Sequence, residues 1–358
     1  MGEANENRNN ATNGSSLRKR KRFVYEKRVS LLAILAQLTL LPPTLVMWLG
    51  PEKTAVGVFN LYLPQIIWVV PLMLALPIIL RYAPRKTLLL IPGLLWVLFV
   101  LMGFIIHWRV QSPRNGGRMI RVMSYNVKWG HRDTDAIAAE IKQDQPDIIL
   151  MQDSQYILDG PVQQALKGYH FRQLYQIAIA SRFPLSPMTA VKLHQPGTAY
   201  NCARALVTVG GRHVTLYSVH LLSPRVGLDE ALQGDFHPLM QGAAIRLTQI
   251  NKLIRLSRNE QNPLLIAGDL NSPPASEVMR KVRKAGFMDA FESRGVGYGY
   301  TYGQYLWPLR LPFLRLDHIL LRGDWRVIHC WTGNSLGSGH SPVIADLWLP
   351  SKTVENRR

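Results

Sequence analysis

Three long apolar runs without charge, near the amino end, constrain the fold of this chain most. They cover residues 29–49, 56–80 and 87–106. A helix of about 20 apolar residues crosses a hydrocarbon core of about 30 Å. We therefore predict three transmembrane helices, the first kinked at Pro42 and Pro43. A cleaved signal peptide would explain at most the first run.

The remaining chain has the composition of a soluble protein. Hydrophobic residues make up 47% of the sequence and charged residues 18%, and the apolar excess lies before residue 107. Residues 118–350 are enough for one large α/β core. We expect a disordered basic tail over 1–28, a linker over 107–117 and a short tail over 351–358.

The distribution of Lys and Arg predicts the orientation of the spans. A basic block ending in Lys27 and Arg28 precedes the first run, and the loop 81–86 carries three cations, whereas 50–54 is neutral overall. Lys and Arg are retained on the cytoplasmic side in short loops. The prediction is a multi-pass protein of the cell membrane, with an extracytoplasmic domain and with anionic lipid head groups at its basic amino terminus.

The net charge of +19 does not by itself indicate nucleic-acid binding. Residues 119–358 carry 27 Lys or Arg against 19 Asp or Glu, an excess that suits any anionic substrate. No long stretch of basic and aromatic residues is present in this region. Cys202 and Cys330 are too few for a disulfide framework, and either two buried thiols or one disulfide fits them.

Two predicted strands end in polar residues that could hold a metal ion. Residues 119–127 alternate apolar and polar side chains around Asn126, and the apolar run 148–151 leads into Asp153. A carboxylate directly after a buried strand lies at the rim of a sheet, where Mg²⁺ is held by one or two protein oxygens. Asn126 and Asp153 are the predicted metal ligands, and Asn126 also a phosphate ligand.

The segment Pro263–Pro274 carries the strongest signal. A buried strand and a glycine precede Asp269 and Asn271, which are two residues apart and so share one side of the chain. Asp269 can position or deprotonate a water molecule, and Asn271 can orient that water or stabilise developing negative charge.

The ordered motifs of residues 118–350 resemble those of the endonuclease/exonuclease/phosphatase superfamily. The matching segments are Ser124–Val127, Pro146–Asp153, Tyr175–Pro184, Val214–His220, Gly268–Asn271, Leu314–Leu321 and Gly337–Val343. By this resemblance His220 and His340 contact the phosphoryl oxygens, and Asp317 accepts a hydrogen bond from His340. Gly297–Tyr302 is similar to the corresponding segment of membrane-anchored bacterial members, including a glycopeptide-resistance-associated type.

The resemblance implies a four-layer α/β/β/α sandwich of two mixed sheets, with the site at one end of the sheets. It implies hydrolysis of a phosphodiester or phosphomonoester by water, with Mg²⁺ or Mn²⁺ as cofactor. The expected substrate is a lipid-linked phosphate or a nucleic acid, and no obligate protein partner is inferred.

Two departures concern the metal site. Asp153 stands where the family has Glu, and Gly339 stands where it has an Asp that contributes to metal binding. They predict weaker metal binding, a single metal or an altered metal preference. They also leave the alternative of a catalytically weakened or silent phosphate-binding module on the membrane.

Overall fold

The computed structural model describes residues 23–107, 112–113, 116–157, 160–194, 201–303, 305–306, 309–334 and 336–351. The predicted tail over 1–28 lies mostly outside these residues, as does the tail over 351–358. The chain forms two compact units. One contains Leu63–Phe104 and the chain up to Val46, and the other contains Met47–Tyr62 and the chain from Ile105 onward.

The amino-terminal unit supplies three helices that are long and apolar enough to cross a membrane: Phe23–Leu49, Gln65–Tyr82 and Pro84–Leu101. The first ends with α2 (Leu41–Leu49). The second and third combine α-helix with tighter or wider turns, in the segments η2 (Gln65–Val69), α4 (Val70–Tyr82), η3 (Pro84–Leu90), α5 (Ile91–Trp96) and η4 (Val97–Leu101). Their large apolar side chains are mostly exposed, as lipid-facing residues are.

The second span begins later than the sequence indicated, because the apolar run 56–80 contains two structures. Its first part is the separate helix α3 (Ala55–Leu61), preceded by the turn η1 (Pro51–Lys53). The Thr54 side chain caps α3 by accepting a hydrogen bond from the Gly57 amide. Pro64 is extended and has no N–H, so it separates α3 from the span. α3 lies in the same unit as the α/β domain.

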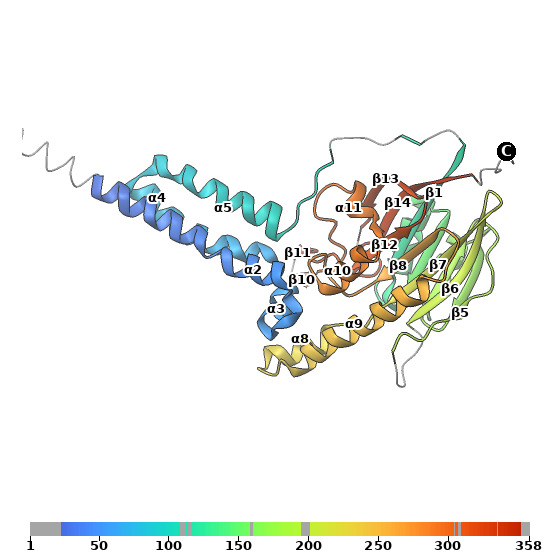
Figure 1. The fold of residues 1–358 in the computed structure, drawn as a ribbon. Helices are drawn as coiled ribbons and strands as arrows, with labels where there is room; N and C mark the ends of the chain where they lie inside the picture. Colours follow the sequence, from blue (N-terminus) through green and yellow to red (C-terminus); the bar gives the residue numbers. More distant parts are fainter. Residues whose placement is uncertain are drawn as a thin grey trace, which may run out of the picture. The chain divides into compact units, whose positions relative to one another are not determined.

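Two mixed six-stranded sheets form the centre of the α/β domain (Figure 1). The first has the order β13-β14-β1-β2-β4-β3, with β1 and β2 parallel, and the second has the order β5-β6-β7-β8-β12-β9, with β7 and β8 parallel. The strands of the first sheet are β1 (Gly117–Asn126), β2 (Ile148–Gln152), β3 (His170–Leu174), β4 (Ile177–Ser181), β13 (Arg326–Thr332) and β14 (Val343–Pro350). Those of the second are β5 (Thr189–Ala190), β6 (Cys202–Val209), β7 (Arg212–His220), β8 (Leu264–Asp269), β9 (Met288–Asp289) and β12 (Asp317–Arg322). A small pair is formed by β10 (Tyr305–Leu306) and β11 (Leu309–Arg310).

The sheets pack face to face, and helices cover their outer faces. The central core joins side chains such as Val122 and Leu150 of the first sheet to Leu216 and Leu265 of the second. A further core lies between the second sheet and two helices, and a third lies between the first sheet and its own helices. The helices are α6 (Thr134–Asp144), α7 (Pro161–Ala165), α8 (Arg225–Leu232), α9 (His237–Ser257), α10 (Glu277–Lys284) and α11 (Ala290–Arg294), and η5 (Lys128–Gly130) is a single turn. The predicted four-layer sandwich is confirmed.

The two cysteines do not pair. Cys202 is on β6 and Cys330 on β13, and both thiols are free and buried. Of the two alternatives that the sequence left open, the structure contains the buried thiols. Burial raises the pKa of the Cys202 thiol above its ordinary value, so it behaves as a small apolar side chain.

Candidate active site

Three neighbouring strands of the second sheet bring the central side chains of the site into register with one another. Asp269 ends β8, and it lies in register with His220 of the parallel strand β7 and with Asp317 of the antiparallel strand β12. Gly268 permits this arrangement, because a Cβ there would stand 1.8 Å from the Val219 carbonyl oxygen. The glycine of the motif is therefore required by the close approach of β7 to β8.

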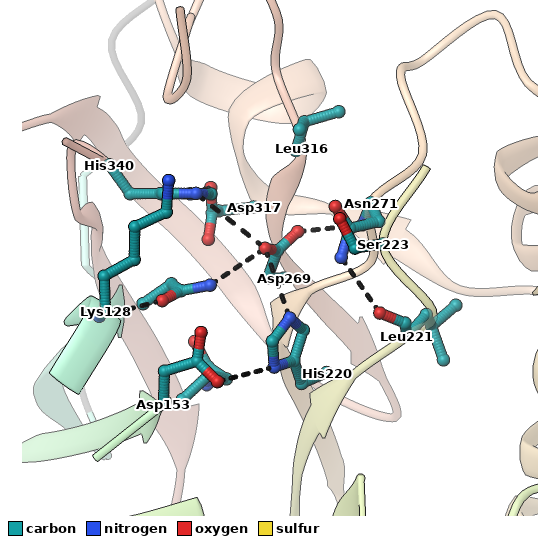
Figure 2. A network of polar contacts seen from close by, with 12 residues as sticks. Lys128, Asp153, His220, Leu221, Ser223, Asp269, Asn271, Leu316, Asp317 and His340 are labelled. Carbon is teal, nitrogen blue, oxygen red and sulfur yellow. Dashed lines mark hydrogen bonds and ion pairs between the residues drawn. The ribbon is translucent and has the colours of Figure 1, made fainter. Parts of the chain in front are cut away.

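The first sheet contributes Asn126 and Asp153, from the adjacent ends of the parallel strands β1 and β2. The Asn126 amide donates a hydrogen bond to Asp269 Oδ2 over 3.0 Å, and its Oδ1 accepts one from the Lys128 backbone N–H over 3.1 Å. Asp153 follows β2 and is only 6% exposed. The site thus lies where the ends of the two sheets meet (Figure 2).

Two histidines face the Asp269 carboxylate. Asp269 Oδ2 is 3.7 Å from His220 Nε2 and 4.0 Å from His340 Nε2. The other ring nitrogen of each histidine faces another carboxylate. His220 Nδ1 is 3.4 Å from Asp153 Oδ1, and His340 Nδ1 is hydrogen-bonded to Asp317 Oδ2 at 2.9 Å (Figure 2). A carboxylate on Nδ1 fixes the orientation of the ring.

The backbone around His340 is fixed by Ser338. The Ser338 hydroxyl donates to the Asn126 carbonyl oxygen over 2.7 Å and accepts from the His340 amide over 2.9 Å. Residues 337–343 are thereby attached to the end of β1. The motif at residues 337–343 therefore links the end of β1 to His340, two parts of the chain that lie far apart in the sequence.

The buried charges shift one another's pKa values. Burial, and then the charge of Asp317, raises the pKa of Asp269. Burial opposes ionisation of Asp317 too, but the charge of His340, hydrogen bonds from His340 and Thr301 and the charge of His318 together outweigh burial and lower the Asp317 pKa. Burial lowers the pKa of His220, yet the carboxylates of Asp153 and Asp269 outweigh it and raise that pKa above its ordinary value. A base with a raised pKa beside an ionised carboxylate is a common catalytic arrangement.

Asn271 lies behind Asp269. Its backbone N–H donates to Asp269 Oδ1 over 2.8 Å, and its side-chain amide donates to the Leu221 carbonyl oxygen over 2.9 Å. The backbone carbonyl oxygen of Asn271 accepts a hydrogen bond from the Tyr62 hydroxyl over 2.8 Å. Asn271 has a φ of +48°, a conformation that asparagine tolerates better than most residues. These contacts support the position of Asp269.

The donor set fits a hard divalent cation. Asp269, Asp317 and His340 offer ligand atoms that all lie within 4.8 Å of one another. Asp317 Oδ1 is buried and has no hydrogen-bond partner, as expected of an oxygen that a cation would use. The predicted ligand Asp153 stands beside this group and faces His220, and the predicted ligand Asn126 bonds to Asp269. The residues could thus hold a cation on either side of Asp269.

Gly339, where the carboxylate is missing, has a φ of +95°. Side chains other than hydrogen are strongly disfavoured there. The glycine is therefore part of the local backbone conformation, and a Gly339→Asp substitution would introduce strain together with charge.

Three residues near the site were not predicted from the sequence: Lys128, Tyr302 and Tyr62. The Lys128 ammonium lies 4.5 Å from the centre of the Tyr302 ring, and that ring lies 4.7 Å from the His340 ring. Tyr62, from the segment between the helices Phe23–Leu49 and Gln65–Tyr82, is 5% exposed and contacts Asn271. Lys128 is two residues from Asn126 and Tyr302 ends the matched segment Gly297–Tyr302, but nothing in the sequence around Tyr62 indicates a role at the site.

The sequence comparison identifies the family. Residues 123–340 match the model of the endonuclease/exonuclease/phosphatase family, so the chain belongs to that family. Its members are hydrolases that act on phosphoester bonds, and they typically use divalent metal ions. A search of curated proteins found no match.

Solved structures show the same fold at low sequence identity. An endonuclease/exonuclease/phosphatase family protein from Bacteroides thetaiotaomicron is 17% identical, with a TM-score of 0.52 over 69% of this chain and 100% of that one. An AP endonuclease from Archaeoglobus fulgidus is 18% identical, with a TM-score of 0.51 over 63% and 98%. ANGEL2, a 2′,3′-cyclic phosphatase in complex with adenosine-2′,3′-vanadate, is 15% identical, with a TM-score of 0.51 over 68% and 99%.

Proposed function

We propose that this protein is a membrane-anchored, metal-dependent phosphoesterase in which Asp269 prepares water for attack on phosphorus. The observation that carries the proposal is the convergence of Asn126, His220 and His340 on the buried Asp269 carboxylate. Such a carboxylate, with its raised pKa, is suited to accept a proton from water.

The flanking side chains have complementary roles. His220 and His340 present Nε2 toward Asp269, on the side where a phosphoryl group would be attacked, and stabilise its negative charge. Asp317 is a positioning residue that orients His340, and Asn126 and Asn271 hold Asp269. A bound Mg²⁺ or Mn²⁺, with Asp153 and Asn126 as its proposed ligands, would neutralise charge on a phosphoryl oxygen.

Turnover by the full-length protein in detergent tests this function. The panel contains phosphomonoesters, lipid-linked pyrophosphates, and single- and double-stranded DNA, each with Mg²⁺, with Mn²⁺ and with a chelator. We expect metal-dependent hydrolysis that Asp269→Asn lowers by about 10²–10⁴-fold. Asp135→Asn, on the exposed first turn of α6, is the matched control. Equal activity in the two variants would contradict the assignment of Asp269.

The second candidate is a silent phosphate-binding module, and the absence of a carboxylate at Gly339 favours it. This reading predicts that the unaltered protein binds inorganic phosphate without hydrolysing any substrate of the panel. Because Gly339 has a positive φ, gain of activity in Gly339→Asp is informative only together with the thermal midpoint of that variant.

We further propose that the spans cross the membrane and place the domain outside the cytoplasm. The Lys and Arg pattern of the loops supports this orientation. The grouping of Met47–Tyr62 with the domain supports the crossing itself, because the second and third spans must then return the chain to the side of the membrane where the first span ends.

A membrane-impermeant thiol reagent on intact cells tests the topology. The exposed residues Lys53, Arg85 and Lys142 are replaced by cysteine one at a time. Labelling of Lys53→Cys and Lys142→Cys, but not of Arg85→Cys, is expected. The native cysteines are buried and do not interfere. Labelling of Arg85→Cys alone would reverse the orientation.

A further inference from the structure

The turn after β1 is held in a conformation that costs free energy. Lys128 has a φ of +43° and Trp129 a φ of +58°, and side chains with a Cβ disfavour this left-handed region. Of the six described non-glycine residues with positive φ, four lie at the site: these two, Asp153 and Asn271. Strained conformations of this kind cluster at functional sites, where the surrounding structure enforces them.

Hydrogen bonds from site residues enforce the turn. The Lys128 amide donates to Asn126 Oδ1 over 3.1 Å, and the Trp129 amide donates to the Asp153 carbonyl oxygen over 2.7 Å. The turn is therefore joined to the ends of both β1 and β2. A glycine would meet the backbone requirement at residue 128 without strain, yet the chain has a lysine there.

The turn directs the Lys128 side chain along the site. Its ammonium lies 4.5 Å from the centre of the Tyr302 ring, which stands 4.7 Å from the His340 ring, and Figure 2 shows the side chain extending toward His340. Burial lowers the pKa of Lys128, and the charge of Asp269 opposes that effect. Lys128 is thus a half-buried cation beside Tyr302, whose ring contacts that of His340.

We propose that Lys128 binds the phosphoryl oxygens of the substrate on the Tyr302 side of Asp269. This inference rests on the proposed function and narrows its substrate class. The Lys128 ammonium stabilises a dianionic phosphate more than a monoanionic one, because the attraction grows with the charge of the ligand. The site therefore favours a terminal phosphate, that of a monoester or a pyrophosphate, over a phosphodiester.

Calorimetric binding of two small probes to the full-length protein, in detergent with Mg²⁺ at pH 8, tests the proposal. The probes are inorganic phosphate, mostly dianionic at this pH, and the monoanion dimethyl phosphate. We expect Lys128→Met to weaken phosphate binding by roughly 10- to 100-fold, as for loss of a hydrogen bond to a charged group. Dimethyl phosphate binding should be weaker in the unaltered protein and fall less. Lys142→Met, an exposed lysine of α6, is the control.

Lys128→Gly separates binding from folding. Glycine adopts a φ of +43° freely, so the thermal midpoint of the Lys128→Gly protein should equal or exceed that of the unaltered protein. Phosphate binding should nevertheless be lost. The proposal is overturned if Lys128→Met binds phosphate within twofold of the unaltered protein. It is also overturned if both variants lose binding only in parallel with a lowered thermal midpoint, or if the unaltered protein binds no phosphate.

The same experiment distinguishes this inference from the proposed function. Phosphate binding that depends on Lys128, in a protein without hydrolytic activity, would refute the phosphoesterase and support the phosphate site. Hydrolysis that depends on Asp269, with phosphate binding unaffected in Lys128→Met, would refute the phosphate site alone.

Discussion

At the scale of single residues, the coupling between Asp269 and Asp317 determines how activity should depend on pH. The Asp317 charge contributes to the raised pKa of Asp269, so Asp269 gains its proton at a higher pH than an isolated carboxylate does. In Asp317→Asn this charge is absent, the pKa of Asp269 falls, and the acid limb of kcat/KM moves to lower pH. Replacement of the carboxylate at His340 Nδ1 by a neutral amide, which no longer stabilises a protonated His340, should also lower kcat, by about 10²–10⁴-fold.

Profiles of kcat/KM against pH for the unaltered protein, Asp317→Asn and the control Asp135→Asn measure this shift. An acid limb that stays in place in Asp317→Asn would show that another group, such as His220, governs it.

The residues at strand ends were predictable, because a strand pattern fixes where the chain leaves the sheet. Asn126, Asp153, His220, Asp269 and Asp317 lie where a strand ends or begins, and the structure brings them together with Asn271 and His340. The position of Lys128 beside the site was not predictable. It depends on a left-handed turn that the sequence Val127–Gly130 does not reveal.

At the scale of elements, α3 links the segment between the first two spans to the site. Val58 and Leu61 are 0% and 2% exposed, and they pack with Leu239 of α9 and with Leu314 and Leu316. Glu52, just before α3, accepts a hydrogen bond from the Glu277 amide at the start of α10 over 2.8 Å. The segment is therefore an integral part of the α/β domain.

Tyr62→Phe tests whether this element positions the site. The change removes the donor to the buried Asn271 carbonyl oxygen, which costs about 1–3 kcal/mol when an acceptor is left unpaired. We expect kcat to fall roughly tenfold with little change in KM, because Tyr62 positions Asn271 and does not face the substrate. Tyr156→Phe, at a tyrosine that is 76% exposed, is the control. A change in KM alone would argue against a positioning role.

The sequence could not separate α3 from the span that follows it. Both are apolar and free of charge, and hydropathy does not distinguish a helix buried in protein from one buried in lipid. Thr54 and Pro64 mark the ends of α3, but prolines also occur inside the spans, as Pro77 does in α4.

At the scale of the whole molecule, the domain predicted at 118–350 is incomplete without Met47–Tyr62. An excised protein of residues 105–358 would expose the side chains that Val58 and Leu61 cover, and each of these two contributes about 1.5–3 kcal/mol of burial. Its thermal midpoint should lie at least about 5 °C below that of a protein in which residues 47–62 are joined to 105–358 by a flexible linker.

Calorimetry on the two soluble proteins measures the difference. A fused segment in which Val58 and Leu61 are replaced by Asp is the control, and it should behave like the excised domain. Equal midpoints for the excised and fused proteins would show that the packing of α3 contributes no stability.

The packing of α3 also imposes an order on how the protein is made. Synthesis begins at the amino end, so α3 is released before α9 and before Leu314 and Leu316, the surfaces that will cover it. During that interval its apolar face has no partner within the chain. The site acquires its Tyr62 contact only when the late segments fold back onto an early one, so the site is complete only after the carboxyl-terminal part of the domain has been made.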